Sequence, residues 1–140
     1  RYLSDYHPGT ARYINLQLLF GICALLGHLF PVFANFKGGK GIATLFGMLI
    51  AIHYLSALAC LGIFLLILFS TRYVSLSSIS AAIMFPVLLI YFFNRDEPLF
   101  IAFGICVALL VLLTHQKNIK RLLNGNENKA KILPRHRRIS

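Results

Sequence analysis

Charged residues are scarce in this chain, and acidic residues are the scarcest. Charged residues of both signs make up 13% of its 140 residues, against 58% hydrophobic residues, and only four residues are Asp or Glu. The mean hydropathy is +0.74. A water-soluble domain carries about 25% charged residues, so this composition excludes an ordinary soluble fold and favours a bilayer as the solvent.

The basic residues are concentrated near the end of the chain. The formal net charge is +10, and Lys and Arg cluster after Gln116. This charge suits anionic lipid headgroups or phosphorylated ligands, and nucleic acid is a poor partner for so apolar a chain. Cys23, Cys60 and Cys106 lie within apolar runs, without metal-ligand spacing. We therefore expect no metal, no disulfide and no cofactor.

Four stretches contain no Asp, Glu, Lys or Arg, namely 14–36, 41–71, 73–94 and 98–116. A membrane-spanning helix needs about 20 apolar residues, so three of these stretches fit one span each. The second stretch is too long for one upright helix and short for two. A turn at His53 and Tyr54 would divide it into a hairpin of two short, tilted helices.

Loop charges favour the hairpin over a single span. It brings Lys37, Lys40, Arg72 and the basic tail to one face, as the positive-inside rule requires. We expect an all-α integral membrane protein with about five transmembrane helices, its N-terminus outside and its C-terminus cytoplasmic. Its single transmembrane domain would comprise a span and loop at 14–36, a phosphate loop at 37–41, a hairpin at 42–71, spans at 73–94 and 98–116, and a basic tail at 117–140.

The most informative segment is the glycine-lysine loop, whose residues are Lys37, Gly38, Gly39, Lys40 and Gly41. Its glycines permit positive φ and let amide groups converge on one acceptor, and a helix that begins after it favours an anion. Pro31 interrupts the preceding helix, and Thr44 is able to cap the next one or donate a hydrogen bond. Gly41 stands where a Walker A loop requires Ser or Thr, so nucleotide hydrolysis is disfavoured. A flexible turn whose lysines contact headgroups stays an equal alternative on composition alone.

Polar residues elsewhere in the sequence fall on the same predicted face. His115 and Asn118 are three residues apart, so they share one side of a helix. His115 is either a ligand or a histidine at a helix end, and Ser75 is either a ligand or a helix cap. For His28 we expect a structural role, with a ring nitrogen bonded to a carbonyl that Pro31 frees.

Three runs of sequence carry a family resemblance: Gly27–Thr44, Arg72–Ile79 and His115–Glu127. They closely resemble the motifs of the bacterial membrane-bound acyl-phosphate:glycerol-3-phosphate acyltransferases, the PlsY family. Gln116 stands where this family often has arginine. The family's first motif and two upstream spans, seven spans in all, have no counterpart here, so we expect the N-terminal part to be missing.

The resemblance implies roles for individual residues. Lys40, His115 and Asn118 would be catalytic, and they would also bind substrate with Lys37, Gly38, Gly39, Gly41, Thr44, Ser75 and Ser77. His28, Pro31 and Glu127 would be structural residues near the site.

The implied reaction moves an acyl group from acyl phosphate to the 1-hydroxyl of glycerol 3-phosphate, the first step of phospholipid synthesis. Its expected setting is the bacterial inner membrane, with the active site on the cytoplasmic side and membrane lipids around it. Functional coupling to the enzyme that makes acyl phosphate is a further expectation. Two alternatives are a small transporter for an anionic metabolite and an inactive lipid-binding fragment.

Overall fold

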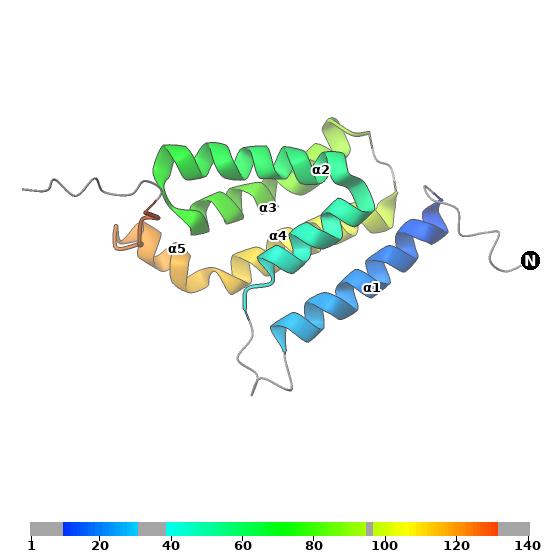
Figure 1. Cartoon of the computed structure of the whole chain (residues 1–140), viewed down its shortest axis with the longest axis horizontal. Helices are drawn as coiled ribbons and strands as arrows, with labels where there is room; N and C mark the ends of the chain where they lie inside the picture. The colour runs from blue at the N-terminus through cyan, green and yellow to red at the C-terminus, as the bar shows by residue number, and fades with distance from the viewer. Residues whose placement is uncertain (1–9, 31–38, 95–96, 132–140) are drawn as a thin grey trace, which may run out of the picture.

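The structure, a computed structural model, describes residues 10–30, 39–94 and 97–131 (Figure 1). Within these ranges all regular structure is helical. The helices are α1 (Ala11–Leu29), α2 (Ile42–Thr71), α3 (Val74–Tyr91), α4 (Pro98–Thr114) and α5 (Gln116–Leu123). The expectation of an all-α membrane protein is confirmed. By length and apolar composition α1, α2 and α3 each qualify as a membrane span, whereas α4 and α5 qualify only together, as a pair bent by 63°.

α2 is broken at His53, which has the non-helical dihedrals φ −153° and ψ 86°. Ser56 stabilises the break, because its backbone N–H donates to His53 Nδ1 at 3.2 Å and its hydroxyl lies 2.6 Å from the same atom. The His53 ring also packs edge-on against Phe93, with ring centroids 5.0 Å apart. A straight helix of 30 residues would separate its ends by about 45 Å. The two halves instead meet at a sharp bend (Figure 1), which returns the end of α2 toward the side where it begins.

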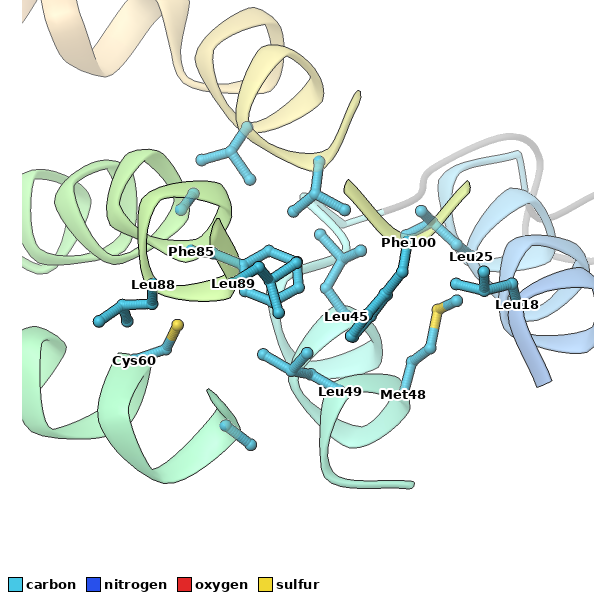
Figure 2. Close-up of a cluster of buried hydrophobic side chains, with 14 of the residues drawn as sticks. Leu18, Leu25, Leu45, Met48, Leu49, Cys60, Phe85, Leu88, Leu89 and Phe100 are labelled. Carbon is cyan, nitrogen blue, oxygen red and sulfur yellow. The ribbon is translucent and has the colours of Figure 1, made fainter. Parts of the chain in front are cut away.

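The buried core lies between α1, both halves of α2, α3 and α4 (Figure 2). Phe100 from α4 is almost fully buried and packs edge-to-face on Phe85 from α3, with ring centroids 6.1 Å apart. α1 is held beside the first half of α2, where the absence of a side chain at Gly21 lets Met48 pack against the helix backbone. Large apolar side chains such as Phe20, Leu66 and Leu109 point outward, as a bilayer requires.

Candidate active site

Three regions far apart in the sequence meet in one group of polar side chains, here called the polar cluster: Lys40, Ser75, Asn118, Arg121 and Glu127. Lys40 Nζ donates to Asn118 Oδ1 at 2.6 Å, and Asn118 Nδ2 donates to Glu127 Oε1 at 2.7 Å. The Ser75 hydroxyl donates to the same Glu127 oxygen at 2.7 Å, and Arg121 Nε donates to Oε2 at 2.7 Å. The cluster therefore connects the start of α2, the start of α3, α5 and the segment after α5.

Glu127 reaches the cluster because the chain reverses directly after α5. Gly125 adopts φ 70°, the left-handed conformation in which helices commonly end. The Asn126 N–H then donates to the Arg121 carbonyl at 2.8 Å, which turns the next residue back toward the helix. Farther on, the Ala130 N–H donates to the Arg72 carbonyl at 2.7 Å and fixes this segment to the turn between α2 and α3. The segment from Asn124 to Ala130 is thus an ordered part of the site.

The electrostatics of the cluster centre on the Glu127 carboxylate. The hydrogen bond from Arg121, followed by those from Asn118 and Ser75, lowers the pKa of Glu127 from 4.5 to about 2, so it is ionised at neutral pH. Lys40 is an exposed residue, yet partial burial of its ammonium group lowers its pKa from 10.5, and Glu127 opposes that shift. A carboxylate only accepts hydrogen bonds, so Glu127 also determines the orientation of the Asn118 amide. The amide oxygen of Asn118 is thereby turned toward Lys40.

His115 lies at the bend between α4 and α5 and is 2% exposed. Its Nδ1 is 2.9 Å from the Val111 carbonyl oxygen. A carbonyl can only accept, so Nδ1 carries the proton and Nε2 of the neutral ring is an acceptor. His115 and Asn118 are both buried, although His115 lies at the bend and only Asn118 lies within α5.

The described part of the glycine-lysine loop is its second half, since Pro31, Lys37 and Gly38 lie outside the described residues. Gly41 has φ 75° and precedes the first turn of α2, as the glycine argument predicts. Gly39 does not have a positive φ. A glycine is needed at position 39 because the chain packs closely there: a Cβ would lie 2.6 Å from His28 Nε2. His28 thus packs against the loop, whereas its expected bond to a carbonyl freed by Pro31 involves residues outside the described ranges.

Two other predicted ligands lie outside the polar cluster. Ser77 is fully buried and its hydroxyl donates to the Tyr73 carbonyl at 2.8 Å, within its own helix. Thr44 is half-buried in the first turn of α2 and takes no part in the cluster's hydrogen bonds. Of the two predicted serines, only Ser75 directs its hydroxyl to the cluster.

Sequence reasoning gave Glu127 only a structural role near the site and did not include Arg121 among the site residues. In the structure Arg121 Nε donates to the Glu127 carboxylate, which is the centre of the polar cluster. The available signal was the single acid in an otherwise basic segment, two residues after a glycine that ends a helix. Among the residues described, no three His, Cys, Asp or Glu side chains gather into a metal-binding group.

An apolar cavity of about 390 Å³ lies between α2, α3 and α4, and some residues of its wall are close in sequence to the polar cluster. Ile42, two residues after Lys40, and Ser78, one turn beyond Ser75, form part of its wall. Val111, whose carbonyl binds His115, forms another part, and Cys60, Phe85 and Phe103 line the interior. A polar cluster with sequence neighbours that line an apolar cavity suits a ligand with a phosphate head and a hydrocarbon chain.

Comparison with known proteins gives a consistent result. Residues 3–125 match a family model described as glycerol-3-phosphate acyltransferase. The chain is 42% identical to the glycerol-3-phosphate acyltransferase of Chlorobium phaeobacteroides (strain BS1), covering 92% of this chain and 63% of that protein. It is 44% identical to that of Salinibacter ruber, covering 86% of this chain and 54% of the relative.

Two solved structures are also similar. Crystal structures of PlsY, an integral membrane glycerol 3-phosphate acyltransferase, match in a glycerol 3-phosphate form and a lysophosphatidic acid form, each with a TM-score of 0.70. The identities are 39% and 38%, and the matches cover 79% and 77% of this chain. Each covers 54% of the PlsY chain, so the present chain spans about half of that protein.

Proposed function

The chain belongs to the glycerol-3-phosphate acyltransferase family, and we propose that the full protein transfers an acyl group from acyl phosphate to the 1-hydroxyl of glycerol 3-phosphate. The observation that supports this proposal is the hydrogen-bonded polar cluster, together with an apolar cavity whose wall includes Ile42, two residues after Lys40. The relatives are named for the acceptor, glycerol 3-phosphate. The choice of acyl phosphate as donor rests on the chemistry of the polar cluster and the apolar cavity.

The donor's phosphate group would bind at the glycine-lysine loop. Lys40 supplies a positive charge at the start of α2, and the positive φ of Gly41 turns the backbone into that helix. The first amide groups of a helix have no partner within it and favour an anion. Lys37 and Gly38, in the preceding part of the loop, would add a second charge and a further amide group. The cavity behind Ile42 would hold the hydrocarbon chain.

Glycerol 3-phosphate would bind at the polar cluster, with its phosphate held by the Lys40 ammonium and the Asn118 amide. In this arrangement the incoming phosphate competes with Asn118 for Lys40, and their bond of 2.6 Å keeps the ammonium in place before substrate arrives. His115 Nε2, the acceptor side of the neutral ring, would receive a hydrogen bond from a glycerol hydroxyl. Glu127 would hold the Asn118 amide in position, and Ser75 would hold the Glu127 carboxylate.

The reaction requires no covalent enzyme intermediate. The 1-hydroxyl oxygen attacks the carbonyl carbon, and a new ester bond forms as the bond from that carbon to the phosphate oxygen breaks. The departing phosphate accepts the hydroxyl proton, and the products are lysophosphatidate and inorganic phosphate. Positioning of both substrates beside Lys40 would supply most of the acceleration. We place this chemistry on the cytoplasmic side of a bacterial inner membrane, with acyl phosphate passed on by the enzyme that makes it.

The test uses the full-length protein in liposomes with acyl phosphate and glycerol 3-phosphate, measuring release of inorganic phosphate and formation of lysophosphatidate. Lys40→Ala should lower kcat/KM by about 10²–10³-fold, the effect of removing one preorganised charged group from a reacting centre. Lys131→Ala is the matched control, because Lys131 is exposed and lies outside the polar cluster. Full activity in Lys40→Ala would refute the proposed role of the loop. Equal rates with acyl coenzyme A as donor would refute the choice of acyl phosphate.

A further inference from the structure

The outward face of α4 carries a stripe of apolar side chains. Ile105, Leu109 and Leu113 are all exposed and are spaced four residues apart, so they lie on one face of the helix. Exposed leucines and isoleucines in a membrane span face hydrocarbon. This face of α4 therefore reports how far the hydrocarbon layer extends along the helix.

The stripe gives way to lysines where the helix bends. At His115 the axis turns by 63° into α5, on which Lys117 and Lys120 are both exposed. Leu123, at the end of α5, is 82% exposed beside them. A short helix with exposed lysines next to an exposed leucine, lying across the end of a span, is typical of the membrane–water interface.

Within the described ranges, no residue neutralises the charges on this side of α5. Neither Lys117 nor Lys120 forms an ion pair with a residue of the described ranges. The nearest acid in sequence, Glu127, already accepts hydrogen bonds from Ser75, Asn118 and Arg121. Lys117 and Lys120 are therefore available to anions outside the protein.

We infer that Lys117, Lys120 and Leu123 form a surface that binds the phosphate groups of anionic phospholipids in the surrounding bilayer. The lysine stems would lie along the acyl boundary with their ammonium groups at headgroup level, while Leu123 inserts between the lipids. A soluble anion gains nothing from Leu123, so the exposed leucine favours a lipid over free phosphate. The inference holds whether or not the proposed acyl transfer is correct.

This surface and the candidate active site share one helix, α5. Asn118 is buried on the opposite side of the same eight-residue helix and holds both Lys40 and Glu127. Lipids that fix the outer face of α5 would thereby fix the position of Asn118. The anionic lipid content of the bilayer would then influence the order of the polar cluster.

A local reporter tests the inference in the full-length protein. The 140 residues contain no tryptophan, so Leu123→Trp adds a fluorophore to the lipid-facing end of α5. The fluorescence of the parent protein is measured as the background. Quenching is measured in liposomes that contain either brominated phosphatidylglycerol or brominated phosphatidylcholine. Quenching should favour the anionic lipid several-fold, up to about fivefold for each lysine. Gln116→Trp, also exposed on α5, is the second reporter if the first variant does not assemble.

Two controls decide the outcome. Lys117→Gln with Lys120→Gln should abolish the preference, and the corresponding pair of Arg substitutions should keep it. Leu99→Trp, exposed at the opposite end of α4, should be quenched equally by both lipids. Equal quenching at position 123, or a preference that survives removal of both lysines, overturns the inference. Loss of the preference on adding inorganic phosphate at constant ionic strength would identify a site for free anions instead.

Discussion

Replacing Glu127 by glutamine tests the central element of the polar cluster. Glu127→Gln keeps the shape of the side chain and removes its charge. The new amide nitrogen is a donor, so it cannot accept from Arg121, and the remaining amide oxygen accepts from Ser75 and Asn118 only as a neutral partner. The substitution therefore weakens three contacts without creating a cavity.

The magnitude follows from the burial of the three donors. A hydrogen bond to a charged group contributes about 1.5–3 kcal/mol, and one between neutral groups about 0.5–1.5 kcal/mol. Ser75 and Asn118 are buried, so weakening both of their bonds costs about 2–3 kcal/mol of unfolding free energy. The Arg121 side chain is 47% exposed, so its pairing adds less than about 1 kcal/mol, although it has the largest effect on the pKa of Glu127.

The assay is thermal unfolding of the full-length protein in detergent, together with acyltransfer. Glu127→Gln should lower Tm by roughly 5–10 °C and reduce activity, because Asn118 loses the partner that orients it. Arg121→Gln is the matched control and should lower Tm by no more than a few degrees. If both variants lost the same stability, the buried donors would not be the main contribution and the reasoning would be wrong.

Three further predictions concern Glu127 and two glycines of the glycine-lysine loop, Gly41 and Gly39. The pKa of Glu127 lies below its unfolded value of 4.5, so the stability that its carboxylate contributes is complete above that pH and is lost as the pH falls toward about 2. Tm should therefore fall between about pH 6 and about pH 3, and Glu127→Gln should remove the part of this fall that Glu127 causes. Gly41→Ala forces alanine to φ 75° and against Leu25, so it should cost at least about 1–2 kcal/mol of unfolding free energy, measured as a fall in Tm. Gly39→Ala should raise KM for acyl phosphate by displacing the His28 ring, and since the φ of Gly39 is not positive, Gly39→Ala with His28→Ala should restore folding stability. A double variant no more stable than Gly39→Ala alone would contradict the packing explanation.

Parts of the fold follow from the sequence alone because they depend on short-range chemistry. Uncharged stretches of about 20 residues predict membrane helices wherever they occur. The excess length of 41–71, with His53 near its middle, suggested the break in α2, and the structure has its non-helical residue there. The positive φ of Gly41 is likewise a local property of a loop that must enter a helix. The predicted cytoplasmic orientation and the five-span count stay predictions.

The candidate site was only partly predictable because its contacts join residues distant in sequence. Lys40 and Asn118 are 78 positions apart, and Ser75 and Glu127 are 52 apart. The resemblance to a family named these residues but not their connections. It also did not distinguish Ser75, which binds Glu127, from Ser77, which bonds within its own helix.

By itself, the sequence determined that this protein lies in a membrane, that it is helical, and that a glycine-lysine loop with a nearby helix start suits an anion. Composition, charge and local backbone freedom are sufficient for these conclusions, since each depends on a few neighbouring residues. Only the tertiary structure decided that Glu127 organises the polar cluster, that Gly39 makes room for His28, and that α5 turns its lysines outward. These features depend on the reversal after α5 and on the packing of α1 beside α2, where distant segments must meet at van der Waals or hydrogen-bond distance.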